Sequence, residues 1–185
     1  GRPNAGKSTL LNKIIGEKVA IVSNKPQTTR TKILGVHTGD DYQLVLIDTP
    51  GIHKPRNKLG QRMEKYIYTA TQDIDALIYV VDCNIGAAEY ELEKESLEGL
   101  KTSGIPVILA VNKIDTLPKL NLLPILDRLG GMYDFSDIIP ISAQKGTNVG
   151  ELLDKIKEYM KEGPKFFPDD VITDQPERSI VAEYI

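Results

Sequence analysis

The first residues of the chain carry glycines, a lysine and a serine at a spacing that suits phosphate binding. Residues 1–8 read GRPNAGKS and fit the pattern Gly-x-x-x-x-Gly-Lys-Ser. In this pattern, backbone N–H groups and the start of a helix surround the phosphates of a nucleotide. We expect the Lys7 ammonium between the β- and γ-phosphates and the Ser8 hydroxyl on Mg²⁺. An ordinary helix start with glycines would give the same residues. The predicted phosphate loop comprises Gly1, Arg2, Pro3, Asn4, Ala5, Gly6, Lys7, Ser8 and Thr9.

An acid and a glycine follow the next apolar run. Residues 44–47 are apolar and lead into Asp48, Thr49, Pro50 and Gly51. Asp48 stands at the end of a predicted strand, where a residue in the second coordination sphere of Mg²⁺ is needed. Gly51 lacks a side chain, so its N–H could approach a γ-phosphate and rearrange when that phosphate leaves. These residues alone would also suit a simple turn, but their position after a phosphate loop favours the nucleotide site.

A polar stretch at residues 23–31 lies between these two motifs. It has no apolar periodicity, which is typical of a mobile surface loop. A site of this kind needs one threonine there, whose hydroxyl binds Mg²⁺ and whose backbone contacts the γ-phosphate. Thr28 and Thr29 both have a suitable position. A second mobile segment is expected at residues 51–60, and its charges favour a solvated face.

Polar side chains also follow the apolar run at residues 106–111. Asn112 is expected to tie its loop to neighbouring loops and to contact the base, and the Lys113 stem to cover the ring. The Asp115 carboxylate can accept hydrogen bonds from guanine N1–H and the 2-amino group, which adenine lacks. Loss of such contacts discriminates by roughly four powers of ten in favourable sites. A strand followed by a polar turn is the alternative interpretation.

A final motif follows the last predicted strand. Ser142, Ala143 and Gln144 stand there, and the Ala143 backbone N–H is expected to donate to guanine O6. This motif is weak by itself. Four motifs in this order, each at the end of a predicted strand, argue against coincidence.

Short apolar runs alternate with helical patterns, which indicates an α/β fold with helices on both faces of a mostly parallel sheet. Polar residues end the predicted strands, at the edge where ligands bind in such sheets. Gly163 and Pro164 are expected to end the last helix, and a further strand is expected before Gly1. Strands are expected at 42–48, 76–82, 106–112 and 137–142, and helices at 6–16, 59–72, 89–103, 121–129 and 149–161.

The composition of the chain narrows the classes of protein to which it can belong. The 185 residues are 41% hydrophobic and 26% charged, which suits one globular domain with a short extension. A formal charge of −3 argues against nucleic-acid binding by bulk electrostatics. The single cysteine, Cys83, cannot form an internal disulfide, and apolar runs such as 105–111 are too short to span a bilayer. These features favour the cytosol.

The ordered set of motifs resembles the translation-factor class of P-loop GTPases. Within this class, GRPNxGKS, QTTR and DTPG with an apolar next residue resemble the group that contains the Era and Der families. Four further segments resemble the Era family of bacterial ribosome-assembly GTPases in particular. These segments are Gly35–Thr38, Gly51–His53, Pro106–Asp115 and Phe167–Asp174. The related Der group is the alternative within the class.

This resemblance implies a P-loop NTPase fold whose first strand precedes Gly1. It also implies a GTPase that converts GTP to GDP and phosphate, as a switch in small-subunit assembly and rRNA processing. The implied Mg²⁺ ligands are Ser8, Asp48 and Thr29, with Thr29 favoured over Thr28. The competing functions are a nucleotide kinase, and an assembly module that uses GTP structurally and rarely hydrolyses it.

The implied catalytic residues are Lys7, Thr29, Gly51 and Asn4. Ile52 stands where Ras-like proteins keep a catalytic glutamine, so slow intrinsic turnover is expected. Asn4 has two interpretations: its carbonyl oxygen helps to hold a potassium ion beside the triphosphate, or it stabilises the loop turn. The resemblance favours the ion.

The resemblance also divides the chain. Residues 1–163 are expected to form the GTPase domain, and residues 164–185 the linker and first residues of a truncated KH RNA-binding domain. The expected partners are guanine nucleotide and, through the KH domain, the small ribosomal subunit and its rRNA. A cytoplasmic monomer with peripheral association at the inner face of the cell membrane is implied.

Overall fold

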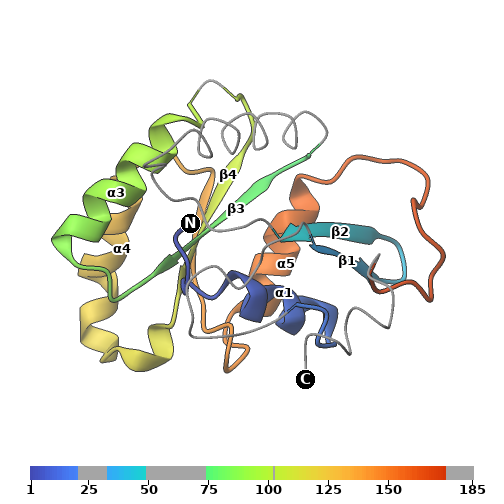
Figure 1. Cartoon of the computed structure of the whole chain (residues 1–185), viewed down its shortest axis with the longest axis horizontal. Helices are drawn as coiled ribbons and strands as arrows, with labels where there is room; N and C mark the ends of the chain where they lie inside the picture. The colour runs from blue at the N-terminus through green and yellow to red at the C-terminus, as the bar shows by residue number, and fades with distance from the viewer. Residues whose placement is uncertain (21–32, 49–73, 102, 174–185) are drawn as a thin grey trace.

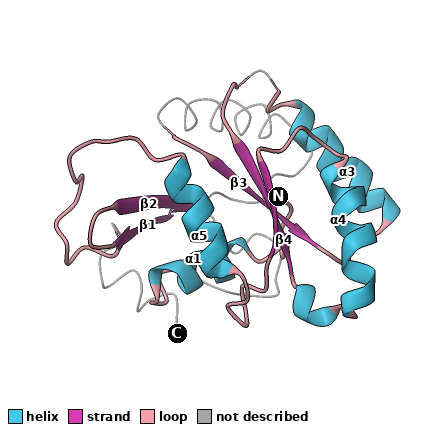
Figure 2. Ribbon diagram, turned by 180° about the vertical axis from the view of Figure 1, so that it is seen from behind, coloured by secondary structure: helices cyan, strands magenta, loops and turns pink. Residues whose placement is uncertain are grey.

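A computed structural model describes residues 1–20, 33–48, 74–101 and 103–173 of the chain. A three-stranded sheet lies between two layers of helices, and a two-stranded sheet lies beside it (Figure 1). Helices α3 and α4 cover one face of the larger sheet, and α1 and α5 lie on the other side (Figure 2). The predicted α/β class with helices on both faces of a parallel sheet is confirmed.

The larger sheet carries the ends of the strands that matter for the site. It contains β3 (Leu77–Asp82), β4 (Val107–Asn112) and β5 (Asp137–Pro140), all parallel, with β4 in the centre. Asp82 pairs in register with Asn112 at the carboxyl ends of β3 and β4. The loops that follow these strands therefore emerge side by side.

Side-chain alternation along the strands divides the core in two. Val80, Ile108 and Ala110 face the cluster that contains residues of α1 and α5. Their neighbours in the strands, among them Tyr79 and Leu109, face the cluster that contains residues of α3 and α4. Because β4 is buried on both faces, it is apolar throughout until Asn112, as expected for a central parallel strand.

The helices begin and end at recognisable residues. Gly6 and Gly16 flank α1 with φ of 96° and 86°, a left-handed conformation that suits glycine. The Gly16 N–H donates to the Asn12 carbonyl and closes the helix. The described helices are α1 (Lys7–Ile15), α3 (Ala87–Glu98), α4 (Leu122–Gly130) and α5 (Val149–Glu158), with short 3₁₀ turns at Ile114–Thr116 and Lys119–Asn121.

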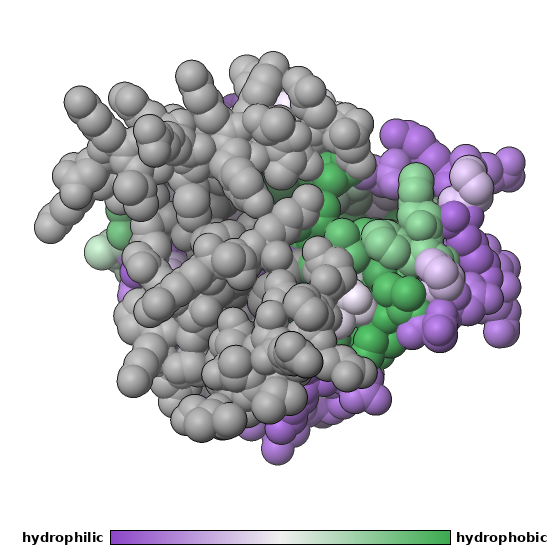
Figure 3. All heavy atoms as spheres, turned by 45° about the vertical axis from the view of Figure 1, so that its right-hand side comes forward, coloured by the Kyte–Doolittle hydropathy of each residue, from purple (hydrophilic) through white to green (hydrophobic). Residues whose placement is uncertain are grey.

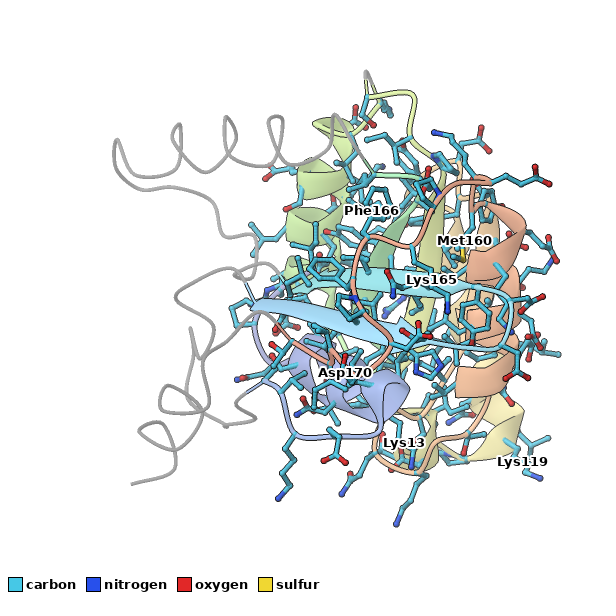
Figure 4. The ribbon with its side chains drawn as sticks, turned by 90° about the vertical axis from the view of Figure 1, so that its right-hand side faces the viewer. Lys13, Lys119, Met160, Lys165, Phe166 and Asp170 are labelled. Carbon is cyan, nitrogen blue, oxygen red and sulfur yellow. The ribbon has the colours of Figure 1, made fainter. Side chains whose placement is uncertain are left out.

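The smaller sheet pairs β1 (Ile33–Thr38) with β2 (Gln43–Asp48) in antiparallel register. The chain after α5 returns to this pair, as Figure 4 shows for the segment that carries Phe166 and Asp170. The Gln43 side chain bonds the backbone of residues 166 and 167, and Thr173 forms a bridge with Gly35. Figure 3 brings the side of the molecule with β1 and β2 forward. Among the described residues, hydrophobic side chains there lie next to hydrophilic ones.

Most element predictions are confirmed within a few residues, with instructive exceptions. Strand β1 was not predicted. The helix expected at 149–161 ends at Glu158, so Gly163 and Pro164 do not end it. The next residue, Tyr159, instead bonds the Asp137 carboxylate through its hydroxyl, at 2.7 Å, and anchors the chain to β5. Similarly, the helix expected at 89–103 ends before Gly99. The helix expected at 59–72 lies outside the described residues.

Candidate nucleotide-binding site

The phosphate loop leads into α1 as predicted, and Gly6 is the residue that allows it. Gly6 has φ of 96°, and a Cβ at this position would collide with the side-chain amide of Asn112. Both observations exclude a larger residue here. Ala5 is buried beneath the loop, and Asn4 is exposed with φ of 62°. The loop therefore curls tightly in front of the helix N-terminus, the geometry that an anion site requires.

Lys7 lies across the loop that precedes it. Its ammonium donates to the carbonyl oxygens of Gly1, at 3.1 Å, and Arg2, at 2.6 Å. Burial lowers the pKa of Lys7 below its usual value, and the charges of Asp48 and Glu93 partly oppose this effect. A half-buried ammonium in this position is suited to neutralise an anion held by the loop.

Ser8 and Asp48 meet although forty positions separate them in the sequence. The Ser8 hydroxyl donates to Asp48 Oδ2 at 2.8 Å. Asp48 is only 6% exposed at the end of β2, so its carboxylate faces inward towards α1. Hydroxyl and carboxylate oxygens are the ligands that Mg²⁺ prefers, and these two residues therefore fit the predicted magnesium site.

Asn112 connects three separate loops. It is 2% exposed, and its Nδ2 donates to the Ala5 carbonyl at 2.8 Å. Its Oδ1 accepts the N–H groups of Lys113, at 2.8 Å, and Ala143, at 2.9 Å. One side chain thus joins the phosphate loop, its own loop and the loop after β5, and the predicted linking role of Asn112 is observed directly.

Lys113 is held by a residue that was not predicted. Its ammonium pairs with Asp82 Oδ2 at 2.6 Å. The other oxygen of Asp82 accepts the backbone and side-chain N–H groups of Asn84, whose amide in turn donates to Thr116. Lys113 has φ of 67°, an uncommon conformation for this residue type, and this network keeps it there. The position of Asp82 at the end of β3, beside the motif in β4, was the available signal.

The other predicted base contacts lie nearby. Asp115 is exposed in the 3₁₀ turn after β4, and Ser142 and Ala143 are buried after β5. The Ala143 N–H, expected to donate to guanine O6, donates to Asn112 Oδ1 in this structure. Gln144 follows it and is exposed.

Several predicted residues fall outside the part of the chain that the structure describes. Thr28, Thr29, Gly51 and Ile52 belong to the two predicted mobile segments, and Thr49 and Pro50 directly precede the second of these segments. Of the remaining phosphate-loop residues, Pro3 and Thr9 are half-buried. Within the described ranges, the phosphate-loop lysine and serine, Asp48 and the two base motifs therefore converge at one edge of the fold.

Comparison with known proteins decides the family. Residues 1–113 match the family described as 50S ribosome-binding GTPase. The chain belongs to this GTPase family. It is also 52% identical over 187 aligned residues to GTPase Era of Alkaliphilus oremlandii, and 49% identical to GTPase Era of Clostridium kluyveri. Each alignment covers the whole chain, which spans 62% of the length of either relative. The resemblance to Era inferred from the sequence is confirmed.

Solved structures agree with this family membership. The crystal structure of Era in complex with MgGDPNP and nucleotides 1506–1542 of 16S ribosomal RNA matches with a TM-score of 0.89 and 39% identity. An Aquifex aeolicus Era variant bound to GDP and AlF4⁻ matches with a TM-score of 0.87 and 39% identity. Both alignments cover 99% of this chain and 62% of the other. Among the helices that the structure describes, none is long and apolar enough to cross a membrane.

Proposed function

We propose that this chain binds guanine nucleotide and Mg²⁺, hydrolyses GTP to GDP and phosphate, and acts as a molecular switch in small ribosomal subunit assembly. The observation that carries the proposal is the position of Asn112. Its side chain holds the phosphate loop at Ala5 and the second base motif at Ala143. A nucleotide requires a base site and a phosphate site that are held at a fixed distance from each other.

Base selection in this proposal rests on Asp115. Its carboxylate is exposed one turn from Asn112, free of the core and positioned on the loop that Asn112 fixes. A carboxylate accepts two hydrogen bonds from guanine and none from the corresponding edge of adenine. The Lys113 stem, anchored at its end by Asp82, would cover the ring.

Phosphate binding rests on the loop amides, Lys7 and Ser8. Bound Mg²⁺ would supply positive charge against the β- and γ-phosphate oxygens. Ser8 and Asp48 would hold the ion, since the two side chains already meet. The Era structure with MgGDPNP supports the presence of Mg²⁺ beside the nucleotide. Thr29 and Gly51 are proposed as the residues that sense the γ-phosphate. Because Ile52 cannot orient water, hydrolysis should be slow without a partner.

The remaining proposals rest on the resemblance to Era. Residues 1–163 would be the GTPase domain, and residues 164–185 would lead into a KH domain that binds the rRNA of the small subunit. The complex of Era with 16S ribosomal RNA supports this partner. We make four further proposals on the same basis. Asn4 would hold a potassium ion, and the protein would be a cytoplasmic monomer that associates peripherally with the membrane.

Turnover measurement tests the enzymatic part. The protein should release phosphate from GTP at a slow, Mg²⁺-dependent rate and none from ATP above background. Lys7→Ala should abolish the activity, whereas Lys119→Ala, on an exposed turn, should leave it unchanged. Equal phosphate release from ATP and GTP would contradict the proposal.

A further inference from the structure

Helix α3 contacts the phosphate loop through two carboxylates one turn apart. Glu93 Oε1 accepts the backbone N–H of Arg2 at 3.1 Å. Glu89 Oε1 pairs with the Arg2 guanidinium at 3.2 Å, while its other oxygen accepts the Gly86 N–H at the start of the helix. The backbone and the side chain of one loop residue are therefore both bonded to α3.

The burial of Glu93 needs an explanation. It is 1% exposed, although α3 otherwise covers the sheet with apolar residues such as Leu97. A buried carboxylate is costly unless its oxygens are hydrogen-bonded. Its Oε2 accepts the hydroxyl of Tyr79 in β3. Burial, reinforced by the Glu93 charge, raises the pKa of Tyr79, so the phenol remains a donor.

Arg2 is consequently fixed on both sides. Its N–H is bonded to Glu93, and its carbonyl accepts the Lys7 ammonium. The chain start also lies against β3 (Figure 2), and a Cβ at Gly1 would collide with the Val80 carbonyl. The loop thus has little freedom to shift where it turns towards the phosphates.

We propose that Glu93 is a positioning residue that presets the phosphate loop for the β-phosphate, by accepting the Arg2 N–H from behind the loop. This inference rests on the proposed nucleotide binding. Loop amides that are already in position bind an anion without a further ordering cost, so Glu93 should raise the affinity for the phosphate groups of the nucleotide. It should not change the affinity for the base.

The test compares variants by their affinity for GDP and GMP, which differ in the β-phosphate. Glu93→Met keeps similar volume but removes both acceptors, and should lower the GDP-to-GMP affinity ratio about five- to tenfold. Glu93→Gln keeps an acceptor for Arg2, while Tyr79 can accept from its amide, so this variant should restore the ratio to within about twofold. Thermal melting establishes that each variant is folded.

Tyr79→Phe is the matched control, because it removes the other hydrogen bond to the same carboxylate and leaves the Arg2 bond in place. It should lower the melting temperature without changing the GDP-to-GMP ratio. If Glu93→Met does not fold, Glu93→Asp replaces it. Aspartate keeps the charge but withdraws the acceptor by one methylene, and should lower the ratio.

An unchanged ratio in folded Glu93→Met, or in Glu93→Asp where it replaces that variant, would overturn the inference. Equal loss in the methionine and glutamine variants would also overturn it, because the charge rather than the acceptor would then matter. Failure of the unmodified protein to bind GDP would instead contradict the proposed function, so the two failures are distinguishable.

Discussion

Replacing Asn112 with alanine should damage both the stability of the domain and its nucleotide site. The substitution removes the partner of three backbone groups: the Ala5 carbonyl and the N–H groups of Lys113 and Ala143. Each buried group left without a partner costs about 1–3 kcal/mol. Water entering the vacated space would offset part of this cost, so we take about 1 kcal/mol for each of the three groups, or about 3 kcal/mol in total.

For a chain of this size, each kcal/mol shifts the melting temperature by about 2–4 °C, so Asn112→Ala should melt about 6–12 °C lower. Differential scanning calorimetry measures the shift. Asn121→Ala is the control, because Asn121 is exposed at the start of α4 and makes no side-chain capping bond. It should melt within about 1–2 °C of the unmodified protein, as surface substitutions usually do.

The same variant should bind GDP at least about tenfold more weakly, because the loss of even one such hydrogen bond approaches this factor. Isothermal titration at a temperature where the variant is folded measures the affinity. If Asn112→Ala melts like Asn121→Ala and binds GDP normally, then Asn112 does not join the loops in the way that its contacts indicate.

Four further predictions concern single residues of the site. Asp115→Asn should shift base preference from GTP towards xanthosine triphosphate, since the amide can donate to the xanthine oxygen; an unchanged preference in competition binding would remove Asp115 from the base site. Ser8→Ala should weaken the Mg²⁺ dependence of GTP binding, and chelation with EDTA should then affect the variant less than the unmodified protein. Burial lowers the pKa of Lys7, so GDP affinity should decline with rising pH from below pH 10.5, as Lys7 loses its proton. Because guanine N1–H also loses its proton in alkaline solution, Lys7→Ala should show a smaller decline, and an equal decline in both proteins would contradict this role of Lys7. GTP turnover should be faster in potassium than in sodium at equal ionic strength, and Asn4→Ala should abolish the difference; equal rates in the unmodified protein would mean that the ion is not used.

Residues in contiguous motifs were predictable from the sequence. The phosphate loop has a fixed spacing because one turn of backbone must surround an anion, and the central strand β4 is readable because burial on both faces makes it apolar throughout. Asn112 and Asp115 follow that strand directly. Their place at the site therefore follows from the strand itself.

Residues that support the site from other elements were less predictable. Asp82 and Glu93 contact Lys113 and Arg2 only because β3 and α3 pack beside those loops. No local spacing records such a contact. Strand β1 was also missed, because Gly35 and the polar residues His37 and Thr38 weaken its strand pattern, and pairing with β2 compensates.

The end of α5 shows the same limit. Gly163 and Pro164 are strong local signals for a helix end, yet the helix ends earlier, where Tyr159 bonds Asp137. A tertiary contact therefore overrode the local signal.

Titration of the protein with GDP and with ADP, both in the presence of Mg²⁺, tests the central claim most directly. That claim is that the phosphate loop and the two base motifs form one guanine-nucleotide site. The account predicts one GDP bound per chain and an affinity for ADP lower by at least about three powers of ten. Comparable affinities for the two nucleotides, or no saturable binding of GDP, would contradict it.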